Sequence, residues 1–200
     1  MYSVDQEDVK VFSLENVESI YTEKTDYVLE TLFPVQDKLF IGTTTGMLIY
    51  DLSDPEKPNF ISVFEHAVSC DPVVVEGDYA YVTLRTGTRC GGWLNQLDIL
   101  DVSDLANPFL LNTRSMTNPH GLGIDNTTLF ICDGTAGLKV YDVDHDNNSE
   151  TTLIFEYPDI VATDVIPLKQ QKLLILVSEE GIFQYDYSDL NNISLLSSIQ

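Results

Sequence analysis

Apolar and polar positions alternate along most of this chain, in the short runs that are typical of β-strands. Five of these runs resemble one another, and each ends in a polar or acidic turn; they lie at residues 9–15, 47–54, 97–104, 138–144 and 182–189. Their shared anchor positions, which follow one another at 38, 50, 41 and 44 residues, are Ser13, Asp51, Asp101, Asp142 and Asp186. A repeat of this length is typical of a four-stranded propeller blade.

Each repeat predicts the same order of strands. A short strand, for example residues 72–75, leads through the turn Glu76-Gly77-Asp78 to a second strand at 79–82. A third strand carries the anchor residue, and a fourth, such as 60–64, closes the unit. No helical periodicity interrupts these strands, which excludes an alternating βαβ protein. The pattern therefore predicts an all-β fold and, within that class, a β-propeller.

Two repeats carry a longer motif, an apolar strand followed by Asp-apolar-Ser-Asp and a proline-rich turn. They run from Met47 to Pro58 and from Leu97 to Pro108, with Leu105 where proline is usual. On these residues the chain resembles the LVIVD-repeat β-propellers of bacteria. The resemblance implies a propeller that is often exported, to the cell surface or the periplasm. It implies no catalytic residues, because the repeat motif is structural.

The number of strands predicts about five blades, of which the first is incomplete. Second to fourth strands occur five times, whereas first strands occur only near residues 30–35, 71–76, 120–125 and 164–168. The approximate units of this single domain are 1–29, 30–70, 71–119, 120–163 and 164–200. Either the chain is a small ring with a defective first blade, or it is the C-terminal arc of a larger propeller. The strand-like start of the sequence favours the arc.

Charge narrows the classes of partner. The net charge is −22, from 32 acidic residues against 10 Lys and Arg, and a field of this sign repels nucleic acids and anionic membrane surfaces. No apolar run approaches the roughly 20 residues that a membrane helix needs, and no signal sequence is visible. Neither nucleic-acid binding nor membrane insertion is expected. The favoured explanation of the acidic composition is solubility, and cation binding is the more specific alternative.

The repeat register brings four polar residues to equivalent positions. They lie eight residues before the second-strand positions Lys38, Tyr79, Thr128 and Lys172, and are Glu30, Asp71, His120 and Asp164. First strands line the central channel of a propeller, so we expect these residues at one channel mouth, the top face. Three interpretations stay open. Asp71, His120 and Asp164 could hold a divalent cation; the set could bind a polar ligand; or each residue could face channel water.

An enlarged loop at residues 84–96 adds a second group of candidates. It carries Arg85, Arg89 and Trp93, and Arg114 lies on the following strand. Guanidinium groups bind carboxylates or phosphates, and tryptophan stacks on sugars; alternatively, these side chains only pack the loop and pair with acids.

The three cysteines add one hypothesis about covalent structure. Cys70 and Cys90 flank the expected top face and are a candidate disulfide, which would suit an exported protein. Cys132 is expected in the core, and three reduced thiols are the alternative.

Two functions follow from these candidates. The first is a non-enzymatic binding or interaction propeller that takes a small polar molecule, a glycan or a protein on its top face. The second is a metal-assisted hydrolase or lyase, with Asp71 or His120 as general base and the arginines holding an anionic substrate. Fold alone does not choose between them. No nucleophile elbow or phosphate loop is visible, so no residue is assigned as catalytic and binding is favoured.

Overall fold

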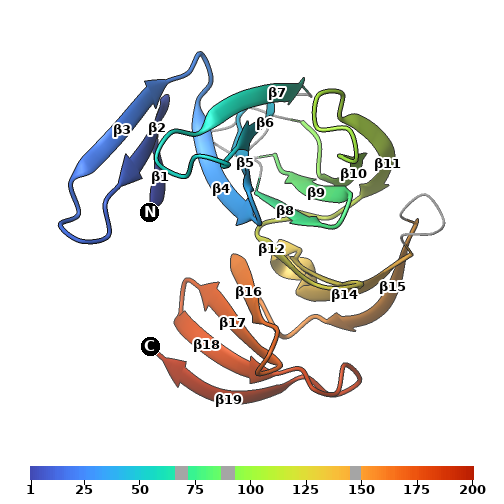
Figure 1. Cartoon of the computed structure of the whole chain (residues 1–200). Helices are drawn as coiled ribbons and strands as arrows, with labels where there is room; N and C mark the ends of the chain where they lie inside the picture. Colours follow the sequence, from blue (N-terminus) through green and yellow to red (C-terminus); the bar gives the residue numbers. More distant parts are fainter. Residues whose placement is uncertain (66–71, 87–92, 145–149) are drawn as a thin grey trace.

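The computed structural model describes residues 1–65, 72–86, 93–144 and 150–200, and these residues form five antiparallel sheets (Figure 1). The first sheet has three strands, and each of the other four has four. The only helical element in these ranges is the short 3-10 turn η1 (Gly134–Ala136), and none there could span a membrane. The strands of the five sheets are β1 (Tyr2–Asp5), β2 (Asp8–Phe12) and β3 (Ser19–Lys24); β4 (Leu29–Val35), β5 (Lys38–Thr43), β6 (Gly46–Asp51) and β7 (Asn59–Glu65); β8 (Val73–Glu76), β9 (Tyr79–Leu84), β10 (Gln96–Asp101) and β11 (Phe109–Ser115); β12 (Leu122–Asp125), β13 (Thr128–Cys132), β14 (Leu138–Asp144) and β15 (Glu150–Tyr157); β16 (Asp164–Leu168), β17 (Leu173–Ser178), β18 (Gly181–Asp186) and β19 (Ser194–Ile199).

The sheets are the blades of a β-propeller. Within each sheet the strands pair in chain order, and the first strands β4, β8, β12 and β16 contact one another from sheet to sheet. Figure 1 shows the five sheets in an arc, with the first sheet (blue) and the fifth sheet (red) at its two ends. The sequence prediction of an all-β propeller with about five blades is confirmed.

The repeated acidic residues shape the turn after each third strand. Asp51, Asp101 and Asp186 each accept a hydrogen bond from the backbone N–H of the serine two residues later, at 3.4, 2.8 and 2.7 Å. Short acidic side chains favour such turns because they bond the local backbone. The motif that reveals the repeat therefore has a structural role.

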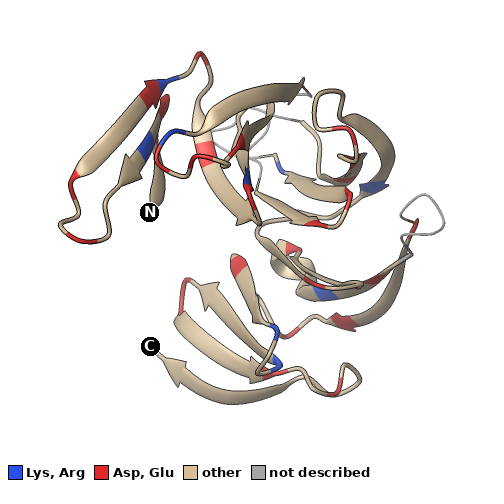
Figure 2. Ribbon diagram, in the orientation of Figure 1, with Lys and Arg blue, Asp and Glu red and all other residues tan. Residues whose placement is uncertain are grey.

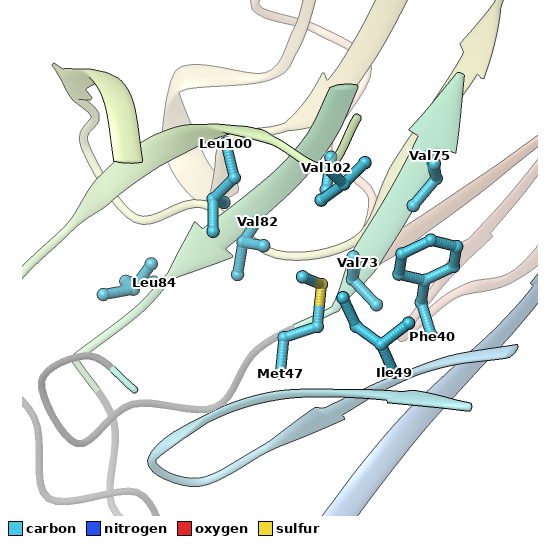
Figure 3. Close-up of a cluster of buried hydrophobic side chains, with 10 residues drawn as sticks. Phe40, Met47, Ile49, Val73, Val75, Val82, Leu84, Leu100 and Val102 are labelled. Atoms are coloured by element: carbon cyan, nitrogen blue, oxygen red, sulfur yellow. The ribbon is translucent and has the colours of Figure 1, made fainter. Parts of the chain in front are cut away.

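The core lies between successive sheets. Figure 3 shows one such cluster, in which Phe40, Met47 and Ile49 of the second sheet meet Val73 and Val82 of the third. Side chains alternate between the two faces of a strand, so the remaining residues of the second sheet serve the opposite interface. Leu39, Ile41 and Leu48 pack there with Val9 of the first sheet. An inner sheet has to be apolar on both faces, which explains its nearly continuous hydrophobic strands.

One buried acidic residue joins the fourth and fifth sheets. Asp125 is only 4% exposed; it accepts a hydrogen bond from the Tyr187 hydroxyl at 2.9 Å and pairs with the Lys172 ammonium at 2.5 Å. Burial alone would raise the pKa of Asp125, but these two donors outweigh it, and the pKa lies below its usual value. The carboxylate stays ionised as the centre of an interface network.

We predict that Asp125→Ala lowers the free energy of unfolding by about 3 kcal/mol, because it leaves Lys172 and Tyr187 without their buried acceptor. Urea denaturation at neutral pH measures the loss. The control is Asp142→Ala on β14 of the same sheet, an exposed carboxylate whose removal should cost no more than about 0.5 kcal/mol. Equal effects of the two substitutions would contradict a role for the Asp125 network.

Candidate functional site

A cavity of about 490 Å³ opens between the fourth and fifth sheets. Its walls come from the segments before β12 and β16 and from the turns after β13 and β17, namely residues 118–120, 159–163, 134–135 and 178–180. Leu176, Phe183 and Tyr185 line it from the face of the fifth sheet that packs on the fourth. The cavity thus lies where the apolar interface between two blades gives way to polar loops.

The lining of the cavity is acidic. Asp159, Glu179 and Glu180 contribute carboxylates, and among the described residues no Lys or Arg lines the cavity. Figure 2 shows that acidic residues are spread over all five sheets, while basic ones are few. Both the local lining and the net field of the chain therefore favour neutral or cationic groups over anions.

His120 is fixed in the cavity wall by its backbone and its ring. Its N–H donates to the Cys132 carbonyl at 2.7 Å, and its own carbonyl accepts the Thr83 hydroxyl at 2.7 Å. The ring Nε2 lies 3.3 Å from the amide nitrogen of Asn118, another lining residue. These bonds hold both polar side chains in place without a ligand.

A buried carboxylate supports the segment before His120. Asp133 is fully buried and accepts the backbone N–H groups of Thr117 and Asn118, at 3.0 and 2.8 Å. The Lys139 ammonium, 3.0 Å away, compensates its charge. This arrangement pre-organises the cavity wall, as a binding site on a rigid scaffold requires.

The protonation state of His120 follows from its surroundings. Burial, and then the positive charge of Arg85, lower the pKa of the imidazole, and Asp133 opposes them only partly. The net shift is downward, so the ring is neutral at pH 7. A neutral imidazole offers one donor and one acceptor, which suits hydroxyl or amide groups of a ligand.

The strand register shows which of the four polar residues predicted at one channel mouth occupy equivalent positions. The N–H of His120 donates to Cys132 on β13, and the equivalent bond in the fifth sheet runs from Thr163 to Val177 on β17. Thr163, rather than Asp164, therefore occupies the position of His120. Four residues, 169–172, connect β16 and β17, whereas two, 126–127, connect β12 and β13. The offset is one residue rather than two because Leu173, not Lys172, pairs with the anchor Asp186 as Thr128 pairs with Asp142.

Asp164 nevertheless lies close to the fourth sheet. A Cβ added to Gly121 would come within 2.0 Å of the Asp164 Oδ1, so only glycine fits beside this carboxylate. The Oδ1 atom accepts the N–H of Val165 at 2.9 Å, and desolvation raises the pKa of Asp164 above its usual value. Glu30 is exposed beside a β-bulge at the start of β4.

The other candidates are divided among several places. Arg114 donates through Nε to the Thr151 hydroxyl at 2.9 Å and lies 5.2 Å from the centre of the Tyr141 ring, so it links the third and fourth sheets. Trp93 is 93% exposed, and Arg85 acts on His120 by its charge. Outside the described residues lie Cys70, Asp71, Arg89 and Cys90.

A metal centre finds no support in the part of the chain that is described. There, no group of three His, Cys, Asp or Glu residues is arranged to share an ion. The predicted trio of Asp71, His120 and Asp164 includes one residue outside that part. The metal hypothesis therefore stays a prediction.

Comparison with known proteins identifies a sequence repeat in this chain and solved structures that resemble its fold. The model of the LVIVD repeat matches residues 69–114, the segment that contains the copy of the motif at Leu97 to Pro108. The third sheet of this β-propeller carries an LVIVD repeat. No curated protein matches the chain.

Solved structures resemble this β-propeller over nearly its whole length. A protein from Lactobacillus plantarum has a TM-score of 0.73 at 14% identity, over 96% of this chain and 64% of its own. The periplasmic gluconolactonase of Pseudomonas aeruginosa has a TM-score of 0.72 at 11% identity, over 99% of this chain and 65% of its own. At such identities the likeness shows the fold alone, and the propeller spans about two thirds of these two relatives.

We predict that His120 makes the stability of the propeller depend on pH. The pKa of His120 is lowered in the folded state. As pH falls through about 6.5, the imidazole therefore becomes protonated in the unfolded chain while it stays neutral in the folded chain. The folded state therefore loses stability below this pH. His120→Gln removes this contribution, so the unfolding free energy of the wild type should fall more steeply than that of the variant between about pH 7.5 and 5.5.

Chemical denaturation at several pH values measures the difference between wild type and His120→Gln. His66 and His145 are present in both proteins, so their titration cancels. Parallel pH profiles would show that His120 keeps its ordinary pKa in the fold.

Proposed function

We propose that this propeller is a binding module that takes a small polar ligand in the cavity between its fourth and fifth sheets. The observation that carries the proposal is the cavity itself, in which polar side chains converge on a space framed by two rigid sheets. Its volume lies in the range of small-molecule sites. The ligand is either a free small molecule or the terminal group of a glycan or of a protein.

The lining favours a neutral or cationic ligand about the size of a hexose. Carboxylates at Asp159, Glu179 and Glu180 attract cations and accept hydroxyl hydrogen bonds. The rings of Phe183 and Tyr185 can pack on the apolar face of a sugar. Arg85 and Arg114, the described arginines, are not part of this lining, so the lining itself does not favour an anionic ligand.

A lactone hydrolase is the alternative that the comparisons raise. Two structural relatives are named a gluconolactonase and a putative 6-phosphogluconolactonase. His120, neutral at pH 7 through its lowered pKa, lines the cavity and has the acid–base range of a general base. Incubation with D-glucono-δ-lactone, with and without Mg²⁺, tests this activity. If the wild type hydrolyses the lactone faster than the uncatalysed rate and His120→Gln abolishes this activity, the protein is an enzyme rather than a binding module.

We predict that ligand charge determines affinity in this cavity. Glucosamine, glucose and glucuronate share the pyranose ring and differ in charge, and titration calorimetry should give affinities in that decreasing order. In the double variant Glu179→Gln, Glu180→Gln the preference for glucosamine over glucose should fall by about two- to tenfold, as expected for two partly exposed charge interactions.

The matched control changes charge far from the cavity. Glu15→Gln, Glu56→Gln removes two exposed carboxylates from turns of the first and second sheets and should leave the preference unchanged. Tightest binding by glucuronate, or affinities that do not respond to the Glu179 and Glu180 substitutions, would count against this cavity as the site.

A further inference from the structure

One aromatic side chain near the cavity lies almost entirely in solvent. Trp93, in the loop that connects β9 and β10, is 93% exposed, and its neighbour Leu94 is 42% exposed. The indole therefore does not pack the loop onto the propeller, which is one of the two interpretations that the sequence leaves open. An exposed indole keeps its large apolar area available to a partner from outside the chain.

The loop of Trp93 lies on the same face of the propeller as the cavity. It leaves β9 after Leu84 and enters β10 at Gln96, and these two residues pair with each other. The same end of the fourth and fifth sheets carries the shorter turns 133–137 and 179–180, and both contribute residues to the cavity lining. The loop is therefore the enlarged counterpart, in the third sheet, of two turns that form the cavity.

Hydrogen bonds of Asn95 join this loop to the cavity wall. The Asn95 Oδ1 accepts the N–H of Thr86 at 2.9 Å, which closes the base of the loop. The Asn95 Nδ2 donates to the carbonyl of Thr117 at 2.9 Å, and the residue after Thr117 is Asn118, which lines the cavity. Two residues of chain span at most about 7 Å, so Trp93 lies close to this junction.

The first residue of the loop is also near the cavity. The positive charge of Arg85 lowers the pKa of the His120 imidazole, so the guanidinium group is close enough to act on a lining residue. Thr83, two residues before Arg85, donates its hydroxyl to the His120 carbonyl at 2.7 Å. Both ends of the loop are thus fixed beside the cavity.

We infer that Trp93 forms a second subsite beside the cavity and that the ligand is an oligosaccharide. This inference rests on the proposed function of the cavity, which takes the terminal sugar, and adds that a following sugar stacks on the indole. The flat indole fits the apolar face of a pyranose ring. Thr117 and Asn118, between the two subsites, are polar and at least partly exposed, so they can form hydrogen bonds with sugar hydroxyls.

Other classes of partner fit these surroundings less well. A protein interface surrounds its aromatic anchors with an apolar core, whereas the described residues around the base of the loop are polar: Arg85, Thr86, Asn95, Gln96 and Thr117. The bases of a nucleic acid would also stack on an indole, but the net charge of −22 repels its phosphates. An oligosaccharide without anionic groups combines a stacking face with hydroxyl groups and meets neither obstacle.

Fluorescence tests the inference directly, because Trp93 is the single tryptophan of the sequence and its emission reports on this subsite alone. The probes are glucosamine and its β-1,4-linked dimer, trimer and tetramer. The tetramer should shift the Trp93 emission to shorter wavelength and protect it from quenching by acrylamide, because a stacked sugar excludes water from the indole. Glucosamine, which occupies only the cavity, should change neither property.

Titration calorimetry measures what the indole contributes to affinity. Trp93→Ala should weaken binding of the tetramer by about three- to tenfold and leave the affinity for glucosamine unchanged. Trp93→Phe keeps an aromatic face and should retain most of the affinity for the tetramer. Neither substitution changes the charge of the chain, so the general attraction between a cationic oligomer and the acidic protein cancels in the comparison.

The matched control removes an aromatic ring from the opposite end of the third sheet. Phe109 is 52% exposed and pairs with Asp101, whereas Gln96, next to the loop, pairs with Ser115 at the other end of β11. Phe109→Ala should leave the affinity for every probe unchanged.

The outcomes separate this inference from the proposed function. Weaker binding of the tetramer alone by Trp93→Ala, with protection of the indole in the wild type, supports the second subsite. If glucosamine binds but Trp93→Ala binds the tetramer as tightly as the wild type does, the cavity is a site and the second subsite is wrong. Equal weakening of glucosamine and tetramer by Trp93→Ala also overturns it, because Trp93 then supports the cavity itself. If no probe binds, the proposed function fails and this inference fails with it.

Discussion

Face-to-face packing of successive sheets is the constraint on which this structure depends. Each strand has two faces, and in an inner blade both have to be apolar because both meet another sheet. Leu39 and Phe40, neighbours on β5, enter two different clusters for this reason. The packed sheets also determine where the loops between their strands lie. The cavity beside His120 exists because two stacked sheets hold the segments around it at a fixed separation.

Much of the fold could be predicted from the sequence because packing and turn formation repeat with the blade. The anchor acids Asp51, Asp101 and Asp186 form the same turn in three sheets, so they mark the repeat whether or not the core residues are known. The missing first strand of the first sheet was also visible, since it leaves one strand-like run too few. Structure and the LVIVD match at residues 69–114 agree on this architecture.

The site could be predicted only in part, because it depends on loop lengths that the repeat does not conserve. Equal spacing from Lys172 made Asp164 the equivalent of His120. In the structure Leu173 is the residue that pairs with the anchor, and two additional residues connect β16 and β17, so Thr163 takes the position instead. Strand alternation turns such a one-residue offset into a change of face. Glu179, Glu180 and Asn118 lie in turns outside the repeat motif, so no periodicity could single them out. The cavity needed the three-dimensional structure to bring these turns together.

Strand alternation separates the two sides of the fifth sheet. Phe183 lines the cavity on the side of the fourth sheet, while its neighbour Ile182 points to the opposite side and is 46% exposed. Affinity in the cavity therefore depends on one side of this sheet, and a substitution on the other side leaves the lining in place.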